Sequence, residues 1–132
     1  VTPPLPFDHA TLRELRELKA YVHVVGLYAV DNIEQSLAQE IDEFDAEMVL
    51  ADLQQVEKRQ ARLKKAQKER PGEKVLLEQI KNMLEAEQPL RQTKWDSGQV
   101  SLLDELGIIS HRPLLTVVNV DESRLQQTKT NT

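Results

Sequence analysis

Two side chains near the end of the chain have the types and spacing to recognise a nucleotide base. Asn119 and Glu122, with Val120 between them, form an N-x-x-E pattern directly after the apolar stretch 114–118. A carboxamide donates and accepts hydrogen bonds, and a carboxylate accepts them from ring or exocyclic N–H groups. Ligands of parallel α/β sheets bind at the carboxyl ends of strands, which is where this pattern lies. The same spacing is also typical of an Asx-type turn that ends a strand, and the residues alone leave both interpretations open.

A run of basic residues is the second candidate site. Nine acidic residues and no Lys or Arg lie between Asp31 and Glu57, whereas residues 58–70 contain seven basic residues and only Glu69 as an acid. Clustered cations favour nucleic-acid phosphates because binding releases counterions. The helix dipole also favours basic residues near a helix C-terminus, although its effect fades within a turn. An RNA- or ribosome-binding surface and a solvated helix end both remain open. The candidate contact residues are Arg59, Arg62, Lys64, Lys65, Lys68 and Arg70.

The other reactive residue types predict no catalytic group and no metal site. The three histidines form no metal-ligand pattern with one another, and the absence of cysteine excludes disulfides and thiolate sites. The chain contains no G-x-x-x-x-G-K-[ST] loop that could cradle phosphates. His23 is expected to be a packed strand residue, and Trp95 is expected to anchor the base of the helical hairpin described next.

These candidates must be positioned by an unusually long helix. Apolar residues recur at gaps of three and four from Asp31 to Arg70, then Pro71-Gly72 breaks the pattern, and a second apolar stripe runs from Glu73 to Ala86. This spacing predicts an antiparallel helical hairpin, a coiled coil with its tip near Pro71. The first helix carries the seam residues Ile33, Leu37, Ile41, Phe44, Met48, Val49, Leu53, Val56 and Leu63.

Two short β-branched runs, Ala20–Val25 and Leu114–Val118, flank the hairpin and predict buried strands. A strand, helices and a second strand imply a right-handed crossover between parallel strands. The expected fold class is a mostly α, α/β protein with two parallel strands joined through the hairpin. Two strands alone would leave open edges and uncovered faces, so self-association through the strands or the helix seam is a further possibility.

Short helices are predicted on either side of the strands. Asp8 is expected to cap the first of these helices and Asn32 or Asp31 the long helix, while Ser97 is expected to cap a helix that Gly107 stops. No apolar run has the length of a membrane span and no signal peptide opens the chain, so we expect a soluble, cytoplasmic protein. Because the first residue is Val, we expect a piece of a longer protein.

Four stretches in order resemble the YchF-type Obg-like ATPases, a branch of the P-loop translation-factor GTPases. The segment at the base of that family's hairpin is similar to EMVLADLQQVEKR at 47–59, and its strand after the second switch region is similar to AYVHVV at 20–25. The helix, turn and strand at 101–115, SLLDELGIISHRPLL, and the NVDE motif at 119–122 also resemble the family. The similarity covers nearly everything from Leu12 to Glu122.

The resemblance implies that residues 1–30 and 91–132 are parts of a G domain and that 31–90 are its coiled-coil insertion. It places Asn119, Val120 and Glu122 at the nucleotide base, with ATP preferred over GTP, and it favours ribosome contact by the basic hairpin tip. The full-length parent would bind and hydrolyse ATP or GTP with Mg²⁺. This chain lacks the family's phosphate-binding loop, both switch regions and the C-terminal TGS domain, so we expect it to bind no cofactor and to be inactive alone.

A different class of function stays open beside this one. The hairpin could belong to a non-enzymatic interaction module that docks a protein or RNA partner, with the strands only closing its base.

Overall fold

The computed structural model describes residues 8–28, 31–66 and 72–121. In chain order the elements are α1 (His9–Glu17), β1 (Tyr21–Leu27), α2 (Ile33–Ala66), α3 (Glu73–Glu85), a short 3₁₀ helix η1 (Leu90–Gln92), α4 (Ser97–Glu105) and β2 (Leu114–Val120). The predicted fold class is confirmed: the chain is mostly helical, and its two strands are parallel.

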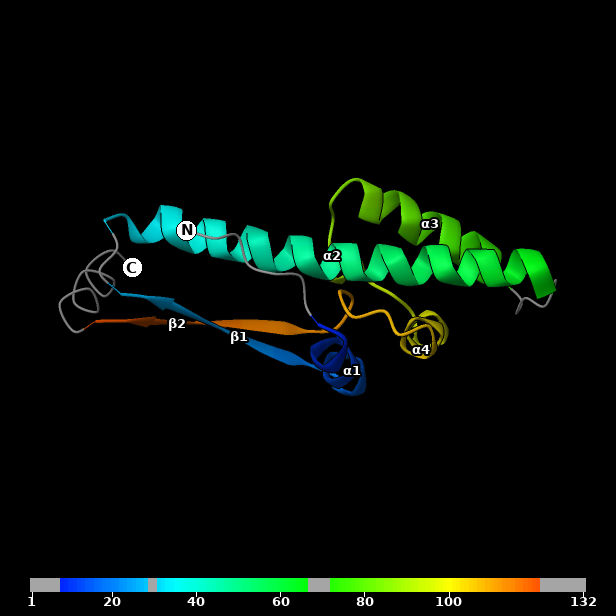
Figure 1. The fold of residues 1–132 in the computed structure, drawn as a ribbon, viewed down its shortest axis with the longest axis horizontal. Coiled ribbons are helices and arrows are strands. Elements are labelled where there is room, and N and C mark those ends of the chain that lie inside the picture. Colours follow the sequence, from blue (N-terminus) through cyan, green and yellow to red (C-terminus); the bar gives the residue numbers. More distant parts are fainter. Residues whose placement is uncertain (1–7, 29–30, 67–71, 122–132) are drawn as a thin grey trace.

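β1 and β2 pair in parallel along their whole length, from Tyr21 opposite Leu114 to Leu27 opposite Val120. The prediction that both strands are buried was wrong for one face of the sheet. α2 runs lengthwise over one face (Figure 1), where His23 stacks on Phe44 with ring centroids 3.9 Å apart. Among the described residues, the side chains on the other face of the sheet project into solvent, so each strand is covered on one face alone. This open face exposes Val22 by 61%, Val24 by 58%, Leu115 by 63% and Val117 by 40%.

α2 is the 34-residue helix that connects the two parts of the molecule. Its first half covers the sheet, and its second half packs against the antiparallel helix α3 (Figure 1). Asn32, one of the two predicted caps, begins α2 by accepting a hydrogen bond from the backbone N–H of Gln35 at 3.0 Å. The predicted hairpin tip at Pro71 lies outside the described residues.

Two apolar clusters meet along α2. The first lies between the hairpin helices and α4, and consists of Val49, Val56, Leu76, Leu77, Ile80, Leu84, Leu90, Leu103 and Ile108. The second lies between α2, α1 and the sheet, and consists of Tyr21, Met48, Ala51 and Ile109. Because adjacent residues such as Met48 and Val49 face different clusters, this one helix contributes to both cores.

The ends of the short helices follow from single residues. Asp8 caps α1 by accepting the Thr11 N–H at 2.7 Å, as predicted. Ser97 was the wrong cap for α4: Asp96 is the N-cap, because its carboxylate accepts the Gln99 N–H at 2.8 Å while the Gln99 side chain accepts the Asp96 N–H at 3.0 Å. Gly107 follows α4 with a φ of 75°, the left-handed conformation that glycine adopts most readily.

Trp95 anchors the hairpin base, as predicted, by packing against the first cluster and donating its indole N–H to the Leu90 carbonyl at 2.8 Å. Among the described residues, no helix combines the length and the apolar character that crossing a membrane requires.

Candidate functional site

Two of the predicted base-recognition residues, Asn119 and Val120, lie at the carboxyl end of the parallel sheet. Asn119 is exposed and pairs in register with Gly26, while Val120 is half-buried opposite Leu27. Side chains alternate along a strand, so Asn119 belongs to the same open face as Leu115 and Val117. Glu122 lies outside the described residues. The structure thus places an accessible carboxamide where the sequence predicted one.

Tyr28 is a neighbour of this end that the sequence analysis missed. A Cβ atom built on Gly26 would lie 3.0 Å from Cε2 of Tyr28, so the exposed tyrosine ring covers the glycine that pairs with Asn119. The ring can lie there because Gly26 has no side chain. The two-residue period of a strand could have predicted this neighbour, since it places positions 26 and 28 on the same side of the strand.

The basic residues lie at the far end of α2, where Arg62, Lys64 and Lys65 are exposed. Arg59 instead is half-buried and pairs with Glu73: its Nε donates to Oε1 of Glu73 at 2.5 Å and its Nη2 to Oε2 at 3.2 Å. The hydrogen bond to Glu73 raises the pKa of Arg59. The other two predicted contacts, Lys68 and Arg70, lie outside the described residues.

The structure does not bring the two predicted sites together. The carboxyl ends of β1 and β2 lie near the start of α2, whereas the basic residues lie near its end (Figure 1). A helix of 34 residues is about 50 Å long. Base recognition and RNA contact would therefore be performed at opposite ends of one rigid element.

A buried polar network fixes α2 to the body of the molecule between these two ends. Asp52 on α2 has no exposed surface, and its carboxylate accepts the backbone N–H groups of Ile109 and Ser110, each at 2.8 Å. Burial raises the pKa of Asp52 to about 6. The hairpin is thus attached to the turn that leads into β2.

Arg112 continues this network toward α1. Its Nη1 donates to the backbone carbonyls of Leu15 at 2.7 Å and Arg16 at 2.8 Å and contacts the Tyr21 hydroxyl at 3.0 Å. A guanidinium at the C-terminus of a helix satisfies carbonyls that have no partner within the helix. α1 is therefore held against the start of the sheet.

The described residues offer no group of three or more His, Cys, Asp and Glu side chains that could hold a metal ion. His111 lies 2.8 Å from Asp104, and burial lowers the pKa of His111. Both residues belong to α4 and the turn after it, at the amino ends of the strands, where they pack with Arg112.

Comparison with known proteins identifies relatives. No family model matches the chain. Over 123 residues it is 30% identical to the ribosome-binding ATPase YchF of Bacillus subtilis (strain 168), a match that covers 86% of this chain and 34% of that protein. The structure of the Schizosaccharomyces pombe YchF GTPase shares its fold, with a TM-score of 0.70 and 20% identity over 97% of this chain and 38% of that one.

Fold and sequence together define an α/β protein whose two parallel strands are joined through a helical hairpin. The chain belongs to the YchF-type Obg-like family, as its four ordered motifs predicted. It spans about a third of the length of the relatives that it matches.

Proposed function

We propose that the chain is part of a ribosome-associated, nucleotide-binding protein of the cytoplasm, and that the basic end of its hairpin contacts ribosomal RNA. The observation that supports this contact best is the exposure of Arg62, Lys64 and Lys65 on one end of a long, firmly attached helix. Such cations gain binding free energy from counterion release when they meet phosphates. The name of the Bacillus subtilis relative, a ribosome-binding ATPase, supports the same partner.

The carboxyl end of the sheet is proposed to recognise the nucleotide base through Asn119, Val120 and Glu122. The exposure of Asn119 supports this role, because its carboxamide is free to meet a ring. ATP or GTP with Mg²⁺ would also need a phosphate-binding loop, and these residues contain none. Hydrolysis is therefore proposed for the longer family proteins, and the 132-residue chain alone is expected to lack it.

Neutralising the exposed cations tests the ribosome contact. We expect R62Q/K64Q/K65Q to bind ribosomes more weakly in co-sedimentation and to lower the slope of log affinity against log salt by about 2, since three phosphate contacts are lost. The matched control is R13Q/K19Q/K94Q, which removes the same charge from exposed positions away from the hairpin end. Equal effects of the two triple variants, or no effect of the first, would reject the proposed contact.

Isothermal titration of the chain with ATP and GTP tests whether the chain alone binds a nucleotide, and we expect no micromolar binding. Micromolar binding of either nucleotide would contradict the proposal that the nucleotide site needs a phosphate-binding loop that these residues do not contain.

A further inference from the structure

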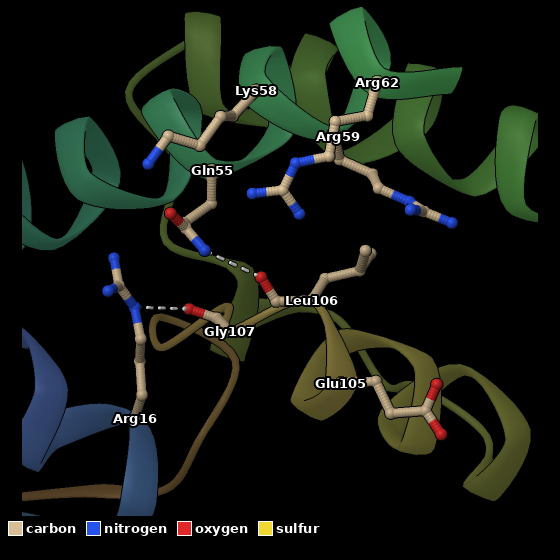
Figure 2. A pocket seen from close by; sticks show the side chains of 8 residues that line it. All are labelled: Arg16, Gln55, Lys58, Arg59, Arg62, Glu105, Leu106 and Gly107. Carbon is tan, nitrogen blue, oxygen red and sulfur yellow. Dashed lines mark hydrogen bonds between the residues drawn. The ribbon is translucent and has the colours of Figure 1, made fainter. Parts of the chain in front are cut away.

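A basic cavity lies where α1, the second half of α2 and the turn after α4 meet. Its volume is about 330 Å³ (Figure 2). Four of its eight lining residues are cationic, namely Arg16, Lys58, Arg59 and Arg62. Figure 2 shows the carboxylate of Glu105, the acidic residue of the lining, pointing away from these cations.

Two of these positive charges have no ion-pair partner among the described residues, and the charge of Arg16 interacts with the buried Asp52. Glu73 pairs with Arg59, but within residues 8–28, 31–66 and 72–121 neither Lys58 nor Arg62 forms an ion pair. Arg16 donates its Nε to the neutral carbonyl of Gly107 at 3.3 Å. Like charges around one cavity repel each other, and an anion placed among them relieves this repulsion.

Hydrogen-bond donors cover two backbone carbonyls that line the cavity, and this favours an anion. Two backbone carbonyls, those of Leu106 and Gly107, would repel an anion if they were bare. Gln55 donates to the first at 3.0 Å and Arg16 to the second at 3.3 Å. Because an arginine carries five N–H donors, the terminal amino groups of Arg16 remain available to a ligand.

Gly107 makes this close approach feasible. A Cβ atom at this position would lie 2.9 Å from Nε2 of Gln55 and 3.2 Å from Cδ of Arg16. The glycine that stops α4 therefore also leaves room for the two side chains that cover the turn.

We propose that this cavity binds a phosphate group, held by Arg16, Lys58 and Arg62. Guanidinium groups match two phosphate oxygens with parallel N–H donors, and an ammonium adds a point charge. The volume lies at the small end of the range for ligand pockets and is ample for a phosphate group. The phosphate can be free in solution or part of an RNA backbone, so the site goes beyond the proposed ribosome contact.

An NMR titration with inorganic phosphate tests the site directly. At constant ionic strength, the side-chain N–H resonance of Arg16 should shift saturably with phosphate and not with chloride. K58Q/R62Q should weaken this affinity by about tenfold or more, because two charge-assisted contacts are lost. R13Q/K19Q removes the same charge from exposed positions outside the cavity lining and should change the affinity by less than about twofold. Equal weakening in both double variants, or no saturable shift in the unmodified chain, would overturn the proposal.

A single-stranded RNA of about 12 nucleotides distinguishes the two sources of phosphate. If RNA displaces phosphate from Arg16, and if K58Q/R62Q lowers the slope of log RNA affinity against log salt by about 1.4, the site binds backbone phosphate. If RNA leaves the phosphate-induced shift of the Arg16 resonance unchanged, the site binds free phosphate. Failure of the ribosome proposal would leave the phosphate titration unaffected, because that experiment contains no ribosome.

Discussion

At the scale of single residues, Asp52 links the two parts of the molecule. Its carboxylate lies on α2 and accepts two backbone N–H groups from the turn that leads into β2. Buried N–H groups without an acceptor are costly, because water no longer solvates them. Asp52 therefore contributes, beside the two apolar clusters, to the position of the hairpin relative to the sheet.

Asp52→Ala should lower the free energy of unfolding by about 2–5 kcal/mol, since each buried N–H that loses its acceptor costs about 1–3 kcal/mol. Asp52→Asn retains one acceptor oxygen and should cost less. Urea unfolding followed by circular dichroism measures both. Asp42→Ala, an exposed carboxylate on the same helix, should stay within about 0.5 kcal/mol of the unmodified chain. A similar loss for Asp52→Ala and Asp42→Ala would contradict the role assigned to Asp52.

The same carboxyl group should make stability depend on pH. Burial raises the pKa of Asp52 from 3.8 to about 6, although hydrogen bonds from Ser110 and Ile109 oppose the shift. The folded state then binds the proton more tightly than the unfolded chain, so this contribution is fully present below pH 3.8 and is lost as the pH rises through about 6.

The unfolding free energy of the unmodified chain minus that of Asp52→Asn should therefore rise by about 1 kcal/mol between pH of about 7 and about 5. Subtracting the variant is necessary because burial lowers the pKa values of His23 and His111, which makes the chain less stable as the pH falls. A difference that is constant over this range would show that Asp52 does not titrate there.

At the scale of elements, the hairpin is closed by an ion pair as well as by its apolar seam. Arg59 on α2 contacts Glu73 at the first residue of α3, and Glu73 has no exposed surface. Removing one member of a buried ion pair leaves the other charge desolvated and without that partner, which is costly. The pair therefore fixes where α3 begins to pack on α2.

Arg59→Met should destabilise the chain by about 2–4 kcal/mol, because the buried Glu73 loses this partner. The double variant R59M/E73L should recover most of the loss, since apolar residues of similar size can replace a buried pair. Arg62→Met makes the same chemical change at an exposed position of the same helix and should change stability by less than about 0.5 kcal/mol in phosphate-free buffer. Thermal or urea unfolding would measure all three, and a double variant no better than R59M would argue against the pair.

At the scale of the whole molecule, the sheet has one covered and one open face. The open face presents Val22 and Val24 beside Leu115 and Val117. Parallel sheets are normally covered on both faces, and a contiguous apolar patch favours association. The chain by itself therefore carries a surface that favours contact with another copy.

We expect the chain to self-associate through this face, with a sedimentation coefficient that increases with concentration. Val24→Lys with Leu115→Lys should give a monomer, because two charges would have to be buried in the contact. Leu50→Lys with Val75→Lys makes two equivalent changes at exposed apolar positions of the hairpin and should leave association unchanged. A chain that sediments as a monomer at all concentrations would contradict this expectation.

The sequence alone determined the elements and their order. The periodicity of Leu37, Phe44 and Met48 predicts a long helix, and the β-branched runs before and after the hairpin predict strands, because these patterns reflect local backbone geometry. The parallel pairing follows from the order strand, helices, strand. The four family-like motifs determined the family, and the position of Asn119 at the end of a strand followed from the same local reasoning.

Only the tertiary structure decided which charged side chains work together. Asp52 meets residues 57 and 58 positions away, and Arg16 meets Gly107 at a separation of 91. In the sequence, Asp52 and Arg59 look like their exposed neighbours, because burial depends on which distant segment packs against each turn of the helix. The phosphate cavity was hidden for the same reason: residues 16, 58, 62 and 107 become one site only when α1, α2 and the turn after α4 have been packed together.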